Sequence, residues 1–355
     1  MLFQICNPKV LYILLVRDCK SRTAGFTPLN IINWLLLILK SKSCTLKVIS
    51  AYKPLIAFIF TGLNLTLGKN MTNLDVNQYY KIKLSNNDFN KLSNFINSNY
   101  GIKMPKAKRI MLQSRLQKRL KELNFTSFKQ YCDYLFSAKG QEEEVIKMMD
   151  VVSTNKTDFF REPAHFNFLK KDIPNNYINN HSSNKNLKIW SAGCSSGEEA
   201  YTLAIILSEL KNQYPEIFFS ILATDISTKM LDKASLAIYD ENKIDTIPLE
   251  LKKKYFLKSK DHSKNKVRVI KELRNKVNFS RLNFMDNYYK VHGKFDCIFC
   301  RNTLIYFDHE TQEKVINKLC LSLKKDGYFF LGHSESINNM NVPLKQIQPT
   351  IFKKI

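Results

Sequence analysis

Residues 187–199 read LKIWSAGCSSGEE: a short apolar strand runs into a loop of small residues, and a helix begins after the loop. Small residues such as Gly193 let a ligand approach the backbone closely, at the carboxyl end of a strand, where parallel sheets bind ligands. The loop lacks the Gly-Lys-Ser/Thr of a Walker loop and does not match G-x-G-x-x-G. Glu198 and Glu199 would repel a pyrophosphate and favour a cationic or hydroxyl-bearing ligand, although acids are also common in the first turn of any helix.

A second feature, another acid, follows the next expected strand, residues 218–223. Asp225 stands where an acid typically accepts hydrogen bonds from ribose hydroxyls. A small-residue loop and an acid without a phosphate cradle fit a nucleoside that lacks phosphates. S-adenosylmethionine has this form, because it joins adenosine to a positively charged sulfonium. The two features together predict a class I methyltransferase.

Strand and helix patterns alternate along the C-terminal half of the chain. Further elements are expected as a strand at 296–300, a helix at 312–323 and a strand at 328–331. This alternation predicts an α/β fold with a parallel, doubly wound, Rossmann-like sheet. We expect a catalytic domain over residues 150–355. A basic inserted subdomain is expected near 240–280, because residues 252–276 hold eleven basic and two acidic residues.

The preceding residues, 71–149, show helical periodicity and predict a small all-helical domain. Beyond Pro105, four leucines have the spacing of one helix face: Leu112, Leu116, Leu120 and Leu123. Residues 103–121 hold eight basic residues and no acid, and four of the basic residues are expected on one arc beside the leucines: Lys108, Arg115, Lys118 and Arg119. We expect the helix near 105–123 to meet an acidic partner. The alternative is a solvated charged face.

Residues 1–70 contain nine basic residues and one acid. Their apolar runs, 31–39 and 55–60, are shorter than the roughly 18–20 residues that a membrane span needs. They lack the charged and apolar regions and the cleavage site of a signal peptide. We expect a non-domain extension, with Met71 as the expected true start. A membrane-associated segment is the alternative.

The composition bounds the class of protein. The 355 residues are enough for about two domains. The net charge of +24 suggests an acidic partner such as nucleic acid, a membrane surface or an acidic protein, and the alternative is a general enrichment in Lys. Eight cysteines in a chain of this length do not make a disulfide framework, which fits a reducing cytoplasm.

No metal site is expected from the cysteines and histidines. Cys297 and Cys300 form a lone C-x-x-C within an apolar strand pattern, which favours burial over a metal or redox role. The six histidines show no H-x-x-x-H pairing. His333 is expected to cap a turn rather than to act as a base.

Five motifs closely resemble the CheR family, whose members are chemotaxis receptor glutamate O-methyltransferases. In chain order they are TNKTDFFRE at 154–162, WSAGCSSGEEAY at 190–201, ATDI at 223–226, FCRNTLIYF at 299–307 and GHSES at 332–336. The resemblance runs from about residue 85 to residue 354 and leaves residues 1–70 without a counterpart.

The resemblance implies methyl transfer from S-adenosylmethionine to receptor glutamates, giving glutamyl methyl esters and S-adenosylhomocysteine. It implies these cofactor-contacting positions: Asn155, Thr157, Arg161, Glu199, Asp225, Asn283, Phe284, Arg301 and Asn302. By the same resemblance Arg161 and Tyr306 are catalytic, near the transferred methyl and the incoming carboxylate. The implied partners are the cytoplasmic methylation helices of chemotaxis receptors, and a receptor C-terminal tail is a further candidate.

The chemistry agrees with this set of residues. A glutamate carboxylate is already ionised near pH 7, so its attack on a methyl group needs no general base. We expect Arg161 to hold the carboxylate of the cofactor by bidentate hydrogen bonding. Tyr306 can hydrogen-bond one oxygen of the substrate carboxylate and leave the other to attack. The alternative for Tyr306 is an aromatic residue packed beyond a strand end.

Two other functions compete with this hypothesis. A nucleic-acid methyltransferase would use the positive charge for phosphates, but amino-directed enzymes usually carry an Asp/Asn-Pro-Pro-Tyr/Phe motif where this chain reads RNTL at 301–304. A catalytically silent binding module would be expected to have lost Arg161, Asp225 or Tyr306, and all three are present.

Overall fold

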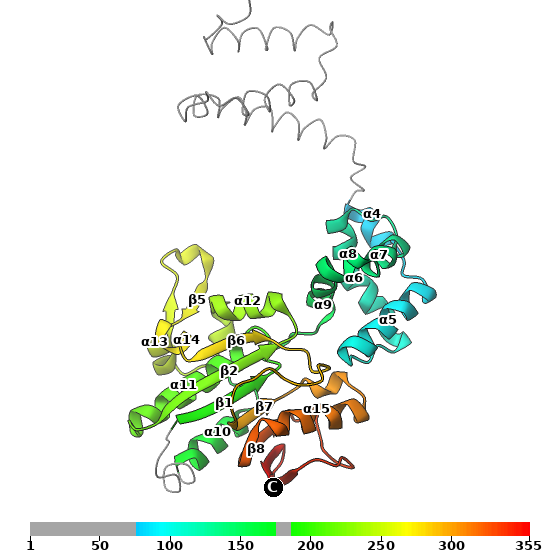
Figure 1. Cartoon of the computed structure of the whole chain (residues 1–355). Helices are drawn as coiled ribbons and strands as arrows, with labels where there is room; N and C mark the ends of the chain where they lie inside the picture. Colours follow the sequence, from blue (N-terminus) through cyan, green and yellow to red (C-terminus); the bar gives the residue numbers. More distant parts are fainter. Residues whose placement is uncertain (1–75, 175–185) are drawn as a thin grey trace, which may run out of the picture. The chain divides into compact units, whose positions relative to one another are not determined.

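The computed structural model describes residues 76–174 and 186–355, and the extension predicted at residues 1–70 lies outside this part of the chain. The described residues begin with helices, drawn in cyan and green in Figure 1. Their bounds are α4 Val76–Lys81, α5 Asn86–Tyr100, the 3-10 turn η1 Lys106–Lys108, α6 Arg109–Leu123, α7 Phe128–Leu135, α8 Ala138–Glu143 and α9 Val145–Val152. The all-helical character predicted before the α/β fold is confirmed.

Local signals explain where α5 and its neighbours begin and end. Ser85 caps α5, because its hydroxyl accepts the Asp88 N–H at 3.0 Å, and Gly101 ends the helix with a φ of 68°. Pro105 precedes η1, so the α-helix that was predicted to start near it starts at Arg109. The helices α8 and α9 are separated by the buried Glu144.

The leucine face of α6 forms part of the helical core, as its spacing predicts. Leu112, Leu116 and Leu120 are fully buried, and Leu123 is partly buried. This burial accounts for the stability of a helix that otherwise carries mainly charged and polar residues.

The basic arc predicted beside the leucines is wrong in part. Arg119 is buried, and its guanidinium donates to the two carboxylate oxygens of Glu144 at 2.7 and 2.6 Å. Arg115 donates to the Val152 carbonyl and to the Thr154 hydroxyl. Helical periodicity gives the direction of a side chain but not the partner that it meets. Arg119 is internal, and Arg115, although partly exposed, is hydrogen-bonded to the end of α9 and to the segment after it.

The second part of the fold is a seven-stranded sheet in the order β6-β2-β1-β7-β8-β10-β9 (Figure 1). The strands are β1 Asn186–Ala192, β2 Phe218–Asp225, β6 Val277–Arg281, β7 Phe295–Cys300, β8 Leu323–Leu331, β9 Leu344–Gln348 and β10 Ile351–Lys354. The first five in this order pair in parallel, and β10 pairs antiparallel with β8 and β9. The predicted α/β, Rossmann-like class is confirmed, with an antiparallel C-terminal hairpin added at one edge.

Helices cover both faces of this sheet. The helices α10 Pro163–Asp172 and α11 Glu198–Gln213 share one apolar core with Ile189 of β1, whereas α15 His309–Leu321 shares another with Trp190. Successive residues of a strand point to opposite faces, so neighbouring residues in β1 enter different cores. No helix in the described ranges is both long and apolar enough to cross a membrane.

A small antiparallel sheet lies within the basic stretch that follows α12 (Thr228–Leu236). Its order is β3-β5-β4, with β3 Ile238–Asp240, β4 Phe256–Lys258 and β5 Lys266–Val269. The helix α13 Leu249–Tyr255 precedes β4, and α14 Lys271–Arg274 follows β5. The main sheet then resumes at Val277, within the range predicted as an insertion.

The connection from β6 to β7, residues 282–294, contains no helix, although parallel strands are usually joined by one. A cavity of about 960 Å³ lies over this part of the sheet. Its lining includes Ser220, Leu222, Asn278, Arg281 and Lys290. The cavity is lined by residues of β2 and β6 together with residues of the connection 282–294 itself.

Candidate functional site

The candidate site lies where the parallel strands β1, β2 and β7 end at one edge of the sheet. The loop after β1 is tied to β2, because the Gly193 and Cys194 N–H groups both donate to the Thr224 carbonyl, at 2.7 and 2.9 Å. Gly193 has a φ of 90°, and a Cβ there would lie 2.4 Å from Thr303 Oγ1 in the loop after β7. Only glycine fits at this point, so the small residue is required by the close approach of the strand-end loops.

Asp225 is the last residue of β2 and is 8% exposed. Its Oδ2 accepts the Ser195 N–H at 2.8 Å, and its Oδ1 accepts the Ser227 N–H at 2.9 Å. Burial raises the pKa of Asp225, and these N–H groups oppose the rise. Each carboxylate oxygen has lone pairs beyond those used here. Asp225 can therefore accept hydrogen bonds from hydroxyl groups while it holds the loop after β1.

Arg301 joins two carboxylates at the end of β7. Its guanidinium donates to Glu162 Oε2 at 2.9 Å and to Glu199 Oε2 at 3.2 Å, and its side chain is 2% exposed. It also donates to the Arg161 carbonyl and lies over the Phe166 ring, with Cζ 5.3 Å from the ring centroid. The guanidinium of Arg301 thus forms its hydrogen bonds with other groups of the protein.

The two carboxylates that Arg301 joins differ in their electrostatics. Burial raises the pKa of Glu199, although Arg301 and the Ser191 hydroxyl, 2.7 Å from Oε1, lower it. Burial alone would also raise the pKa of Glu162, but Arg301 and the His333 N–H bring it below its ordinary value. Glu162 is therefore the more firmly ionised of the two.

The segment between α9 and α10 carries three of the predicted site residues. The Ser195 hydroxyl donates to the Asn155 carbonyl at 3.0 Å and so joins this segment to the loop after β1. The Thr157 carbonyl accepts from Lys243 Nζ at 3.1 Å. Arg161 is partly exposed, and its guanidinium donates to a backbone carbonyl of its own segment at 3.1 Å. Within the described ranges Arg161 forms no ion pair, so it can hold an added carboxylate.

Asn283 and Phe284 follow β6. Asn283 Nδ2 donates to the Asn99 carbonyl in α5 at 2.8 Å, so this side chain reaches the helical region. Phe284 is 9% exposed, and its ring lies edge-on to that of Phe307, with the centroids 6.1 Å apart. The structure therefore places Asn283 beside α5 and Phe284 beside Phe307, which follows the turn after β7.

Tyr306 ends the 3-10 turn η5, Leu304–Tyr306, which follows β7. Its carbonyl accepts the Lys103 N–H at 2.8 Å, and Lys108 Nζ lies 6.0 Å from the centroid of its ring. The ring is partly exposed. The basic start of the α6 region therefore touches the turn that carries Tyr306.

Two acids to which the sequence assigned no role hold Asn302. Glu162 Oε1 accepts the side-chain amide of Asn302 at 3.2 Å, and Glu335 Oε2 accepts its backbone N–H at 2.9 Å. Both acids belong to motifs that support the family resemblance, at 154–162 and 332–336. Membership of these motifs is the only feature of the sequence that indicates a role for them. Their partners are more than 30 residues away, at 140 and 33 residues.

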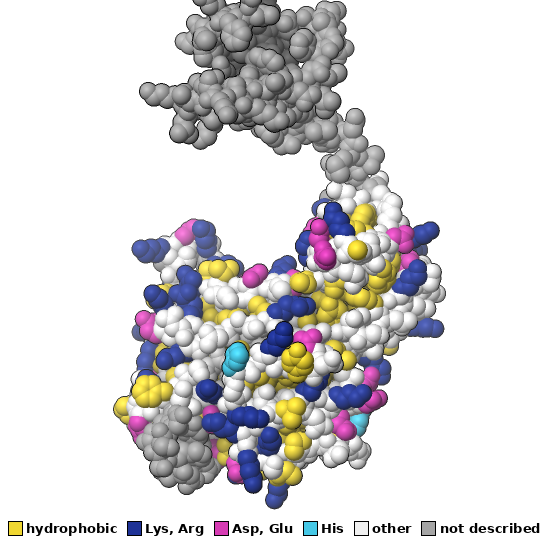
Figure 2. Space-filling view, viewed as in Figure 1, with side chains coloured by type: hydrophobic (Ala, Val, Ile, Leu, Met, Phe, Trp, Pro, Cys, Tyr) yellow, Lys and Arg dark blue, Asp and Glu magenta, His cyan; other side chains and the backbone are white. Residues whose placement is uncertain are grey.

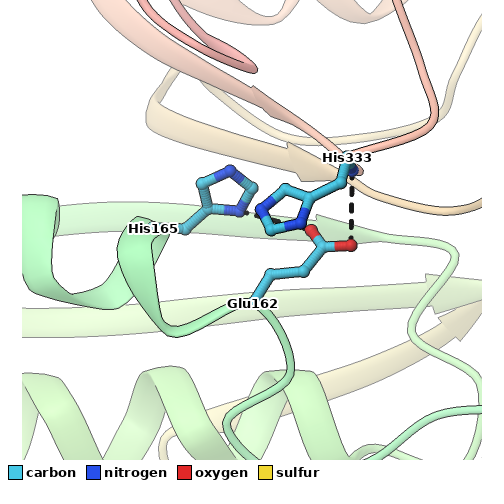
Figure 3. A group of neighbouring side chains, drawn as sticks. All are labelled: Glu162, His165 and His333. Carbon is cyan, nitrogen blue, oxygen red and sulfur yellow. Dashed lines mark hydrogen bonds and ion pairs between the residues drawn. The ribbon is translucent and has the colours of Figure 1, made fainter.

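Figure 3 shows a cluster that sequence spacing does not reveal, formed by Glu162, His165 and His333, whose ligand atoms lie within 4.8 Å of one another. His165 Nδ1 is 3.7 Å from Glu162 Oε2, and the His333 N–H donates to Glu162 Oε1 at 3.3 Å. Burial, with a smaller effect of Arg301, lowers the pKa of His165 to about 4, so its ring is neutral near pH 7. Arg301 already pairs with this carboxylate, which disfavours a second cation. The cluster serves to anchor Glu162.

Comparisons with known proteins agree with this geometry. The family model described as "CheR methyltransferase, SAM binding domain" matches residues 155–352, and the one described as "CheR methyltransferase, all-alpha domain" matches residues 87–153. A chemotaxis protein methyltransferase of Borreliella burgdorferi is 38% identical over 81% of this chain and 98% of its own length. Chemotaxis protein methyltransferase 2 of Pseudomonas aeruginosa is 34% identical over 71% of this chain and 87% of its own. The Salmonella typhimurium protein is 34% identical over 78% of this chain and 92% of its own.

Proposed function

Because the chain belongs to the CheR methyltransferase family and is an S-adenosylmethionine-dependent enzyme, we propose that its strand-end site methylates glutamate side chains of chemotaxis receptors. The products are glutamyl methyl esters and S-adenosylhomocysteine. The observation that best supports this function is the buried Asp225 carboxylate beside a loop without a phosphate-binding sequence. Such a site suits an adenosine that carries a sulfonium rather than a dinucleotide.

The residues at the strand ends fit this cofactor. Asp225 has acceptor capacity for the ribose hydroxyls, and the Arg161 guanidinium suits a carboxylate. Because Glu199 and Arg301 pair with each other, we assign their side chains to shaping the site and any cofactor contact of Arg301 to its backbone. The remaining proposed contacts are Asn155, Thr157, Asn283, Phe284 and Asn302.

The proposed transfer needs positioning more than proton transfer. When bound, the cofactor supplies a methyl group activated by a positively charged sulfur. The substrate carboxylate is ionised near pH 7, so one of its oxygens would attack the methyl carbon without a general base, and the electron pair of the broken carbon–sulfur bond would stay on sulfur. Tyr306 can hydrogen-bond the second oxygen of the substrate carboxylate. Arg161 would hold the carboxylate of the cofactor in place. Alignment and exclusion of water then provide most of the acceleration.

We propose that the acidic methylation helices of the receptor dock on the basic residues near 105–123. The lysines exposed there are Lys103, Lys106, Lys118 and Lys121. Lys108 lies over the Tyr306 ring, so this surface adjoins the proposed transfer site. Lys and Arg side chains are spread widely over the face seen in Figure 2, in keeping with the net charge of +24. The basic insertion near 240–280 is the proposed place for a receptor C-terminal tail, and no nucleic acid is required.

We also propose a cytoplasmic location and a division of labour between residues 71–149, for docking, and 150–355, for catalysis. The described cysteines are all buried and unpaired, as is usual in a reducing compartment. They are Cys132, Cys194, Cys297, Cys300 and Cys320.

Transfer of a labelled methyl group tests the function. The chain is incubated with labelled S-adenosylmethionine and either receptor cytoplasmic fragments or nucleic acid. We expect label on the fragments, released by mild base because a methyl ester hydrolyses there. Fragments with glutamine at the methylated positions are the control and should stay unlabelled. Label on nucleic acid, or base-stable label on the protein, would contradict the proposal.

A further inference from the structure

Glu335 is a buried acid that the proposed mechanism does not use. It lies four residues beyond the end of β8 and is 8% exposed. Its Oε1 accepts the Leu304 and Ile305 N–H groups at 2.7 and 3.3 Å. Its Oε2 accepts the Asn302 and Gly332 N–H groups at 2.9 and 2.7 Å. One carboxylate thus accepts hydrogen bonds from three backbone N–H groups of the turn after β7 and from one just beyond the end of β8.

Burial disfavours the charged form of this carboxylate. Burial raises the pKa of Glu335, although the four N–H groups oppose the rise. Unlike Glu162, Glu335 has no guanidinium or ammonium within ion-pair distance among the described residues. Buried charges of this kind are typical of sites where the charge shapes a functional group.

The turn that Glu335 holds has an unusual backbone. Asn302 has a φ of 56°, in the left-handed region that residues with a Cβ rarely occupy. Gly332 packs against it so closely that a Cβ on Gly332 would lie 2.7 Å from the Asn302 backbone nitrogen. Such a conformation persists only when its surroundings fix it. The Asn302, Leu304 and Ile305 N–H groups converge on Glu335 and form an anion-binding nest filled by the chain's own carboxylate.

The two ends of the turn are held by other groups. Arg301, before the turn, is fixed by Glu162 and Glu199, and the Tyr306 carbonyl, at its end, accepts the Lys103 N–H. The middle of the turn, residues 302–305, is held by Glu335. The geometry points to Glu335 as a positioning residue that sets the conformation of residues 302–306 and thereby places Asn302 and the Tyr306 ring. This inference rests on the role proposed above for Tyr306.

Glutamine is the sharpest replacement because it keeps the size of the side chain. Its one amide oxygen can accept two of the four N–H groups, but its NH₂ group would face the other two, donor against donor. Aspartate keeps the charge but is one methylene shorter, so it cannot reach all four. Both changes should loosen the turn, and neither touches Asp225 or Arg161.

The test compares Glu335→Gln and Glu335→Asp with Glu310→Gln, an exposed acid on α15 that serves as the matched control. At saturating S-adenosylmethionine and receptor fragment, we expect kcat to fall about 10–100-fold in Glu335→Gln, while the receptor KM changes little, because the misplaced group acts in the transition state. Amide hydrogen exchange should speed up in residues 302–306 and not in β1 or β2. The control should match the wild type in both measurements.

Two results for Glu335→Gln would contradict a positioning role for Glu335. Wild-type kcat and wild-type exchange over residues 302–306 in Glu335→Gln would overturn the inference. Faster exchange throughout the chain would also overturn it, since Glu335 would then be a general structural residue. If Glu335→Gln does not fold, Glu335→Asp decides by the same two measurements. Tyr306→Phe is measured beside them: if it keeps wild-type kcat, the role of Tyr306 fails, whereas the exchange data still decide whether Glu335 holds the turn.

Discussion

The helical region and the strand ends each contain a buried arginine that pairs with carboxylate, but the two pairs have different settings. Arg119 and Glu144 have side chains that are 8% and 1% exposed, and the Tyr131 hydroxyl completes the set at 3.1 Å from Glu144 Oε1. Arg119 also pairs with Glu122, whose side chain is 60% exposed. Arg301 instead joins two carboxylates that are both nearly buried, and the Arg161 carbonyl. The first pair ties α6 to the junction between α8 and α9 within a core, whereas the second ties together the segments that carry the candidate site.

The two regions also differ in the balance of buried acids and guanidinium groups. Around Arg301 stand three buried or nearly buried acids for one guanidinium: Glu162, Glu199 and Glu335. A surplus of buried acid is a poor way to stabilise a fold and is common where groups must be aimed at a ligand. We therefore expect damage to the first pair to lower stability and damage to the second to lower turnover.

The largest expected effect is on stability, from Arg119→Met. The change leaves Glu144 buried without its partner, which typically costs about 3–5 kcal/mol. Denaturant unfolding at 25 °C should show this loss, whereas turnover per folded molecule should stay within about twofold, because within the described ranges Arg119 bonds none of the proposed cofactor-binding or catalytic residues. The double variant Arg119→Met/Glu144→Met should recover much of the loss. A single variant as stable as the wild type would show that the pair is not structural.

Arg301→Lys should have the opposite profile. Lysine keeps the charge but loses the planar fork that reaches Glu162, Glu199 and the Arg161 carbonyl together. We expect turnover to fall about 10–100-fold through misplacement of these segments. Arg119→Lys is the matched control and should keep its turnover. Equal turnover in the two variants would erase the distinction between the pairs.

A smaller effect is expected from the exposed lysines of the helical region. Replacing Lys106, Lys118 and Lys121 with Glu should slow receptor methylation about 3–10-fold at low salt, because steering charges act on association and are screened by salt. Cofactor affinity should not change. Three exposed lysines of the α/β region are the control: Lys171, Lys325 and Lys345. If both sets slow the reaction equally, general charge and not docking is the cause.

The smallest effect concerns pH and His165. Its folded-state pKa of about 4 lies below the ordinary value of about 6.5, so between these values the unfolded chain binds the proton and the folded chain does not. Stability should therefore fall as the pH falls from 6.5 to 4, and His165→Gln should flatten this part of the melting-temperature profile. His333→Gln, at an exposed position, is the control. Parallel profiles for the wild type and His165→Gln would show that His165 does not contribute.

The sequence predicts the parts of the site that depend on neighbours along the chain. The strand, small-residue loop and helix around Gly193 form one local unit, and Asp225 follows a strand whose apolar pattern is clear. The periodicity of a helix does not fix the residue at which the helix begins. The helix predicted from residue 312 begins at His309, because Asp308 caps it by accepting the Thr311 N–H at 2.8 Å.

Groups that meet only through tertiary packing could not be predicted. Arg119 and Glu144 are 25 residues apart, and nothing in the periodicity of α6 indicates that they pair. Glu162 and His333 are 171 residues apart, and the motif around Glu335 gives no sign that its carboxylate holds the turn after β7. A single sequence specifies the direction of these side chains but not what packs against them.

Calorimetric titration of S-adenosylmethionine into the wild type and Asp225→Ala tests the central claim, that the cofactor binds at the ends of β1, β2 and β7. The variant lacks the acceptor for two charge-assisted hydrogen bonds from the ribose, each worth about 1.5–3 kcal/mol, so Kd should rise at least about tenfold. Asp232→Ala, at an exposed position on α12, should bind like the wild type. An unchanged Kd in Asp225→Ala would contradict the account and remove the strand ends as the cofactor site.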